Sequence, residues 1–227
     1  MNHRLLPGLL SRYGEMSATS LSHPLFARFF ARFAPAAERL GGAAHRDELL
    51  DGLAGKVIEV GAGSGLNFTH YPSSVTEVLA IEPEPYLRAR ATEAARHAPV
   101  PVRVVEGTAE TLPVEDGSFD AVVFSLVLCS VPDQAAALAE CSRVLRPGGE
   151  VCFYEHVLAE EAGLARLQRR VDLVWPRLGG GCHASRDTPR AIERAGFSVT
   201  SSRRFAFRPC LLFAPVSPHV IGRATRP

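Results

Sequence analysis

The sequence predicts an α/β domain with a seven-stranded, mostly parallel sheet, one antiparallel strand, and helices on both faces. Between residues 56 and 154, short β-branched segments alternate with segments of helical pattern. This alternation is typical of a parallel sheet whose two faces are covered by helices. Two further strand-like segments near the C-terminus have little chain between them, so we expect them to pair in antiparallel fashion at one edge of the sheet.

The strand-like segments are short and rich in valine, isoleucine and phenylalanine, as in "DAVVFSL" at residues 120–126. Such apolar runs are typical of strands buried on both faces. Six of the strands should run parallel and one should be reversed. They are predicted at residues 57–60, 78–81, 102–105, 120–126, 150–154, 198–207 and 219–225.

Helices are predicted in the connections between these strands. Residues 84–98 form an amphipathic pattern with arginines on the outer face. Residues 132–145 begin with a proline and are followed by Pro-Gly-Gly, which are typical start and stop sequences of a helix. We also expect a short helix directly after Gly65 and another over residues 186–197, ended by Gly196.

The N-terminal part of the chain has a different pattern. Residues 1–22 are weakly patterned, whereas residues 23–40 repeat phenylalanines at helical spacing with arginines between them. This helix could pack on the main domain, close over an apolar site as a lid, or lie on a membrane surface; membrane contact is the reading we favour least. We therefore divide the chain into an N-terminal helical segment, residues 1–50, with a lid as one of its readings, and a main domain, residues 51–227.

Composition limits the classes of partner and compartment. The 227 residues carry a formal net charge of +1, which gives no reason to expect a nucleic-acid partner. The five cysteines form no Cys-x-x-Cys pair, so we expect neither a disulfide framework nor a metal site, Cys182-His183 being an isolated pair. No run reaches the roughly 18 apolar residues of a membrane span, and the N-terminus is a poor signal peptide. We expect a cytoplasmic protein.

A glycine-rich turn follows the first predicted strand, in "VIEVGAGSGLNFTHYP". Gly61, Gly63 and Gly65 are spaced G-x-G-x-G, and Leu66 occupies the position of the third glycine in the dinucleotide fingerprint G-x-G-x-x-G. A P-loop is excluded because no Gly-Lys-Ser/Thr follows. The turn therefore favours neither a dinucleotide nor a nucleoside triphosphate.

Two glutamates refine the choice of ligand. Glu59 lies near the end of the first strand, where a carboxylate suits a cation and repels a pyrophosphate. Glu82 follows the second strand, where an acid suits the two hydroxyls of a ribose. Together they describe a ligand with a ribose and a positive centre but no phosphate, a description that S-adenosyl-L-methionine fits.

The motifs also carry a family resemblance. E-x-G-x-G-x-G, the acid after the second strand, "GTAETLPVEDGSFDAVV" and "RVLRPGGEV" follow one another between residues 56 and 155. In this order they resemble the class I S-adenosylmethionine-dependent methyltransferases. The resemblance implies a Rossmann-like methyltransferase fold, S-adenosyl-L-methionine as cofactor and S-adenosyl-L-homocysteine as product.

The resemblance implies a role for each matching position. Glu59 would orient the amino group of the cofactor, Glu82 would hold the ribose, and Glu110 would read the adenine. Asn67 either contacts the cofactor carboxylate or caps its own helix. The full set of cofactor-binding candidates is Glu59, Gly61, Ala62, Gly63, Gly65, Asn67, Glu82, Pro83, Thr108, Ala109, Glu110, Ser125 and Leu126.

A narrower resemblance concerns the methyl acceptor. "SLVLCSVPDQ", "DLVWPRLGGGCHASRDTPRAIERAGF" and "SPHVIGRA" are similar to the thiol S-methyltransferases, which have a methyltransferase type 11 domain. This implies a small-molecule acceptor, most simply a thiol. His156 is then the candidate catalytic residue, as a base or by orienting the acceptor, and Trp175 is a candidate acceptor contact. An oxygen, nitrogen or carbon acceptor, such as a quinone or a natural product, and a catalytically silent cofactor-binding protein remain as alternatives.

Overall fold

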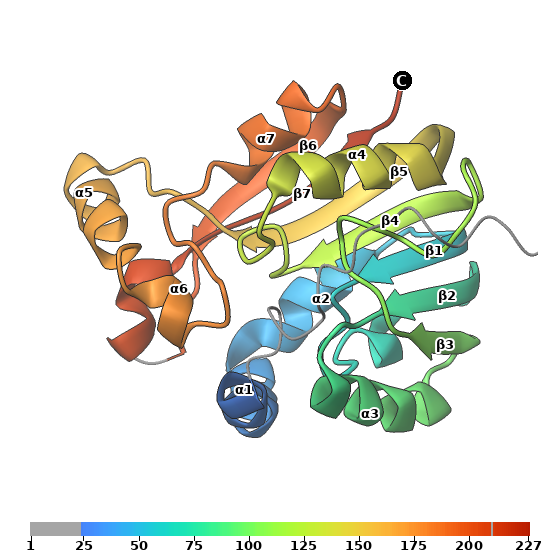
Figure 1. Ribbon diagram of the computed structural model, residues 1–227, viewed down its shortest axis with the longest axis horizontal. Helices are drawn as coiled ribbons and strands as arrows, with labels where there is room; N and C mark the ends of the chain where they lie inside the picture. The colour runs from blue at the N-terminus through green and yellow to red at the C-terminus, as the bar shows by residue number, and fades with distance from the viewer. Residues whose placement is uncertain (1–23, 210) are drawn as a thin grey trace, which may run out of the picture.

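The computed structural model describes residues 24–209 and 211–227 and contains a seven-stranded sheet in the order β3-β2-β1-β4-β5-β7-β6 (Figure 1). β7 is antiparallel to both β5 and β6, and β1 to β5 are mutually parallel. Six strands therefore share one direction and one is reversed, which confirms the prediction. The strands are β1 (Gly55–Val60), β2 (Val75–Ile81), β3 (Val102–Val105), β4 (Phe119–Ser125), β5 (Leu145–His156), β6 (Ser198–Ala206) and β7 (Pro218–Thr225).

Helices cover both faces of the sheet, and Figure 1 shows α4 and α7 on one side with α3 on the other. Alternate residues along a strand enter different cores: Ile58 and Val122 pack under α4 and α7, whereas Val57 and Val123 pack under α2 and α3. The helices are α1 (Pro24–Ala37), α2 (Ala43–Leu50), α3 (Pro85–Ala94), α4 (Gln134–Val144), α5 (Ala162–Val171), α6 (Trp175–Leu178) and α7 (Thr188–Arg194). Gly196, with φ of 91°, follows the last of them as expected.

The short helix expected after Gly65 is the 3-10 helix Phe68–His70, which follows a series of turns. Pro72 follows closely, and a residue before proline is restricted to extended backbone. Tyr71 accordingly has φ of −66° and ψ of 129°. The proline thus leaves too little chain for an α-helix.

The N-terminal helix is interrupted. After α1, the π-helical turn Glu38–Gly42 contains Gly41, whose φ of 125° is outside the helical region, and α2 then continues toward β1. Residues 1–22, expected to be weakly patterned, lie outside the described residues. Among the helices of residues 24–209 and 211–227, none has the length and apolar character that crossing a membrane requires.

Candidate active site

A cavity of about 490 Å³ opens at the carboxyl ends of β1, β2, β4 and β5. The strand order reverses between β1 and β4, and open α/β sheets bind ligands at such a switch point. The volume lies in the range of small-molecule sites. Its lining includes these predicted residues: Glu59, Gly61, Ala62, Gly63, Asn67, Glu82, Pro83, Thr108, Ala109, Glu110, Ser125, Leu126, His156 and Trp175.

Gly65 is not part of this lining. A β-carbon built on it would lie 2.7 Å from the ring of Phe68 and 2.9 Å from the β-carbon of Ala94, and its φ is 81°. Glycine is needed at this position for packing and backbone conformation. Gly65 therefore belongs to the G-x-G-x-G spacing because the turn requires a glycine there, and it does not contact the cavity.

The other two glycines bring the backbone close to the cavity. Gly61 and Ala62 donate N–H hydrogen bonds to the carbonyl of Ile81 at 2.8 and 3.0 Å. A β-carbon on Gly61 would lie 2.6 Å from a methyl group of Val127, so no larger residue fits between β1 and the loop after β4. The turn is thereby held against the ends of β2 and β4.

Glu82 directly follows β2 and organises the glycine turn. Its carboxylate accepts N–H hydrogen bonds from Gly63 at 2.7 Å and Glu84 at 2.9 Å. Burial raises the pKa of Glu82 to about 7, against the lowering effect of these two hydrogen bonds. Each carboxylate oxygen can accept a second hydrogen bond, and the group lines the cavity. It is placed to accept hydrogen bonds from a diol.

Glu59 is buried at the end of β1 and is held by two donors. The amide of Asn67 donates to one oxygen at 2.9 Å, and the hydroxyl of Tyr71 donates to the other at 2.7 Å. Burial raises the pKa of Glu59 to about 7, the hydrogen bond from Tyr71 opposing this. The side chain of Asn67 makes no capping hydrogen bond, so of its two predicted roles the capping of its own helix does not occur.

Arg46 is a functional candidate that the sequence motifs do not contain. It is buried on α2, lines the cavity, and donates to Asn67 at 2.6 Å and to the hydroxyl of Ser125 at 3.1 Å. Its remaining partner is Glu38, at 3.0 Å. A guanidinium at this position gives the cavity a fixed positive charge near Glu59, suited to a ligand carboxylate.

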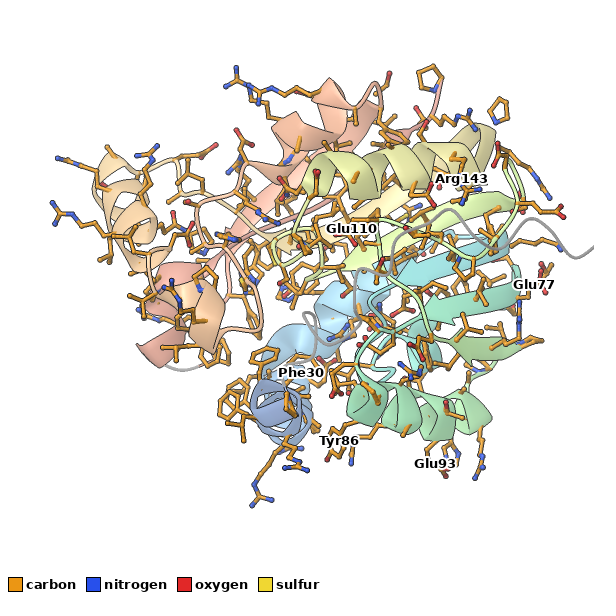
Figure 2. All side chains as sticks on the ribbon, in the orientation of Figure 1. Phe30, Glu77, Tyr86, Glu93, Glu110 and Arg143 are labelled. Atoms are coloured by element: carbon orange, nitrogen blue, oxygen red, sulfur yellow. The ribbon has the colours of Figure 1, made fainter. Side chains whose placement is uncertain are left out.

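The loop after β3 presents an unpaired acceptor. Thr108 and Thr111 form an isolated β-bridge that holds the loop, and Ala109 is buried. Oε1 of Glu110, labelled in Figure 2, is buried and has no hydrogen-bond partner among the described residues. Buried polar atoms are nearly always paired, so this oxygen fits a donor on a ligand, such as the exocyclic amino group of an adenine.

The loop after β4 is held in a strained conformation. Leu126 has φ of 61°, unusual for a residue with a side chain, and its N–H donates to the carbonyl of Tyr154 at 2.6 Å. Glu155 is fully buried, and its carboxylate accepts hydrogen bonds from the three N–H groups that follow Leu126, those of Val127, Leu128 and Cys129, at 2.9, 2.8 and 3.0 Å. Burial raises the pKa of Glu155 despite these donors. The carboxylate fixes the loop that ends at Cys129.

His156 lies at the other end of the cavity, beside two thiols. Its Nδ1 is 3.5 Å from Sγ of Cys129 and 3.3 Å from Sγ of Cys182, and the two sulfurs are 3.8 Å apart. Burial opposes the charged imidazole, but Cys182 beside it raises the pKa of His156. The thiol of Cys129 and the imidazole lower the pKa of Cys182. Along the chain Cys182 has only His183 beside it as a possible metal ligand. In the fold, the side chains of Cys129 and His156 also lie within 4.8 Å of it.

Aromatic side chains wall this end. Trp175 packs edge-on to Phe213 with ring centroids 6.2 Å apart, and Phe213 stacks on Phe33 of α1 at 5.1 Å. Phe30, labelled in Figure 2, lines the cavity from the same helix but beside the glycine turn, where a β-carbon built on Gly63 would lie 3.4 Å from its ring. At its opposite flank α1 packs on Leu87 of α3. One helix therefore contacts both ends of the cavity.

Comparison with known proteins identifies the family. Residues 58–153 match the family described as "Methyltransferase domain", Methyltransf_11. The thiol S-methyltransferase TMT1B of Homo sapiens is 37% identical over 183 residues, covering 78% of this chain and 74% of the relative. TMT1A of Homo sapiens, also a thiol S-methyltransferase, is 38% identical over 181 residues, covering 77% and 73%. The chain belongs to the thiol S-methyltransferase family. It is an S-adenosylmethionine-dependent methyltransferase with a Rossmann-like fold.

The family has relatives with other acceptors. The phosphatidylethanolamine N-methyltransferase of Cereibacter sphaeroides is 31% identical over 159 residues, covering 68% of this chain and 76% of the relative. Among solved structures, a SAM-dependent methyltransferase of Thermotoga maritima has a TM-score of 0.66 and 23% identity, covering 89% and 98% of the two chains. The [4+2]-cyclase SpnF has a TM-score of 0.65 and 19% identity, covering 88% and 94%. These two likenesses show the fold alone.

Proposed function

We propose that this methyltransferase transfers the methyl group of S-adenosyl-L-methionine to the sulfur of a small, largely apolar thiol. The observation that carries the proposal is the division of one cavity into two ends of different chemistry. The end around the glycine turn is polar and charged, whereas the end at His156 is walled by aromatic side chains. The names of the human relatives support a thiol as the acceptor.

The polar end suits the cofactor group by group. We assign the ribose to Glu82, the adenine amino group to Glu110 and the cofactor carboxylate to Arg46. Glu59, through Asn67 and its own carboxylate, orients the amino group, and Pro83 lies beside the adenine. When bound, S-adenosyl-L-methionine supplies a methyl group already activated by a sulfonium, so the protein needs to position the acceptor and exclude water.

The acceptor end is less suited to an amine than to a thiol. The carboxylates that line the cavity in the described part of the chain lie with the cofactor loops or pair with Arg46; they are Glu38, Glu59, Glu82, Glu84 and Glu110. An ammonium acceptor would need such a carboxylate to hold it. A thiol needs groups that favour the thiolate, and His156 is among them.

A product assay with the purified protein tests this proposal. The protein is incubated with S-adenosyl-L-methionine labelled in the methyl group and with matched thiols, phenols and primary amines of equal carbon skeleton. We expect label in methyl thioethers. Label on amines alone would favour the N-methyl transfer of the Cereibacter relative, and cofactor binding without any labelled product would favour a silent cofactor-binding protein. Either result would contradict the thiol assignment.

We also place the enzyme in the cytoplasm. Four of the five cysteines are within the described residues, and all four are free thiols. Free thiols persist in a reducing compartment. Fractionation of the source cells with an antibody to the protein tests this, and recovery in an extracytoplasmic fraction would contradict it.

A further inference from the structure

Three side chains at the acceptor end form a compact set of metal-type ligands. Cys129 comes from the loop after β4, His156 from the end of β5, and Cys182 from the segment that follows α6. Their ligand atoms all lie within 4.8 Å of one another. Three segments that are far apart in the sequence thus converge on one point, beside the site proposed for the methyl acceptor.

The spacing of these atoms matches a tetrahedral zinc site. With Zn–S of about 2.3 Å and Zn–N of about 2.0–2.1 Å, a tetrahedron has edges of about 3.8 Å between sulfurs and about 3.6 Å between sulfur and nitrogen. The Sγ atoms of Cys129 and Cys182 are 3.8 Å apart, and Nδ1 of His156 is 3.5 and 3.3 Å from them. A disulfide would instead need an S–S distance of about 2.05 Å.

The surroundings hold the three ligands in place. The carboxylate of Glu155 fixes the backbone N–H of Cys129 at 3.0 Å, and the N–H of His183 donates to the carbonyl of Cys129 at 2.8 Å. The second bond ties the two cysteine segments together. The hydroxyl of Ser130 is 3.5 Å from the sulfur of Cys129, which is the kind of outer contact that orients a metal-bound thiolate.

One polar group beside the cluster lacks a partner. Trp175 packs against the group of residues that contains Cys129 and Cys182. Its indole N–H is buried, makes no hydrogen bond of ordinary geometry within the described part of the chain, and lies close enough to the thiol of Cys182 to lower the pKa of that group. His156, Cys182 and Trp175 all line the cavity, whereas Cys129 is fully buried behind it. The cluster is therefore closed on the protein side and open toward the cavity, with the indole of Trp175 beside the opening.

We propose that Cys129, His156 and Cys182 bind a Zn²⁺ ion whose fourth position faces the cavity and takes the sulfur of the acceptor thiol. This inference rests on the proposed function and specifies how its acceptor is activated. Two thiolates and one imidazole with an open fourth position are a known catalytic zinc arrangement. Soft sulfur ligands in tetrahedral geometry favour zinc over the harder divalent ions.

With zinc bound at this site, every bond, electron pair and proton of the methyl transfer is accounted for. The acceptor R–SH binds zinc through sulfur and releases its proton to water. A lone pair of the bound sulfur forms the new S–CH₃ bond, while the bond between the methyl carbon and the sulfonium breaks and its electron pair stays on the donor sulfur. The products are R–S–CH₃, S-adenosyl-L-homocysteine and the released proton. A neutral thioether is a weaker ligand than a thiolate, so the methylated product leaves the metal.

The charges at the site favour the same reaction steps. Two cysteine thiolates neutralise the Zn²⁺, and the acceptor thiolate gives the complete site a net charge of about −1. That charge faces the sulfonium across the cavity, and it disappears in the transfer along with the positive charge of the donor. The metal also keeps the acceptor ionised at neutral pH, because a coordinating thiol is deprotonated outright.

Metal analysis of the protein tests the site independently of catalysis. Protein purified without chelators, or reconstituted with Zn²⁺ and desalted, should hold about one zinc per chain. The single variants Cys129→Ala and Cys182→Ala should each lower zinc affinity by about 100-fold or more, since loss of even an outer partner costs 10–100-fold. Cys141→Ala and Cys152→Ala, which remove buried thiols of the main core, are the matched controls and should retain the metal.

Cobalt substitution then tests the open position. Co²⁺ bound by two thiolates gives an intense sulfur-to-metal absorption band, and addition of an acceptor thiol should strengthen it through a third sulfur. Circular dichroism establishes that each variant is folded. Equal zinc affinity in the Cys182→Ala variant and the wild-type protein would overturn the inference. So would a cobalt absorption band that does not change when the acceptor thiol is added. Thiol methylation by the metal-free protein would overturn it and leave the proposed function standing. A zinc-loaded protein that methylates only amines would refute the function instead.

Discussion

The backbone N–H of Gly63 donates a hydrogen bond to the carboxylate of Glu82 at 2.7 Å. This bond joins the glycine turn after β1 to the end of β2, so the residue assigned to the ribose also shapes the turn beside it. Binding and loop conformation are consequently linked through one carboxylate.

Replacement of Glu82 should weaken cofactor binding. In Glu82→Gln the amide has one acceptor oxygen instead of two, and we expect affinity for S-adenosyl-L-homocysteine to fall by about 1–3 kcal/mol, or about 5- to 150-fold. Isothermal titration calorimetry measures the change. Glu77→Gln is the control, because Glu77, labelled in Figure 2, lies on β2, the strand that ends just before Glu82, but is exposed and paired with Lys56. Equal affinities of the two variants would refute the ribose assignment.

Stability and binding should depend on pH in opposite senses. Burial raises the pKa of Glu59 and of Glu82 to about 7, from 4.5. Between these values the folded protein binds more protons than the unfolded chain, so these groups make the free energy of unfolding fall as pH rises from about 5 to about 7. Cofactor affinity should rise over the upper part of that range, because the ionised carboxylate is the better acceptor.

Urea unfolding of the cofactor-free protein and calorimetric titration, in the same series of buffers, measure the two trends. Glu82→Gln removes one of the two titrating groups and should flatten both. A variant with the wild-type pH slope in both measurements would show that Glu82 does not titrate in this range.

Arg46 should discriminate ligands by their carboxylate. Arg46→Gln is expected to lower affinity for S-adenosyl-L-homocysteine by about tenfold or more, since charge-assisted hydrogen bonds contribute about 1.5–3 kcal/mol. Affinity for methylthioadenosine, which lacks the amino-acid part, should change little. A similar loss for both ligands would mean that Arg46 acts through the packing of α2 and does not bind the carboxylate.

Glu110 should discriminate ligands by their base. Its unpaired Oε1 accepts the adenine amino group in our assignment, so Glu110→Gln should reduce affinity for S-adenosyl-L-homocysteine by about tenfold. The amide can donate as well as accept, and the variant should therefore bind the inosine analogue, with a carbonyl in place of the amino group, better than the wild-type protein does. Competition between the two ligands measures this, and an unchanged preference would contradict the assignment.

The sheet could be predicted from the sequence because each strand is marked by residues that are neighbours along the chain. Each strand is a short apolar run. Glu59 stands just before the glycine turn in the chain, and Glu82 directly follows the next strand. Glu59 and Glu82 therefore line the cavity as expected. The helix expected after Gly65 is short and of the 3-10 type, because the proline at position 72 restricts Tyr71 to extended backbone.

The parts that the sequence did not reveal are contacts between distant segments. Arg46 meets Ser125 across 79 positions of the chain, and Cys129 meets Cys182 across 53. Neither pair belongs to a spacing motif, so only the fold brings them together. The expectation that no metal binds followed from Cys182 being isolated along the chain, which says little about its neighbours in space.

The helix α1 forms a wall at both ends of the cavity, against Leu87 of α3 on one flank and Phe213 on the other. It is joined to α2 through Gly41, whose φ of 125° is accessible mainly to glycine. We expect the methyl thioether and S-adenosyl-L-homocysteine both to leave the cavity past α1. Movement of this helix should then limit the turnover rate, which should fall in viscous solvent.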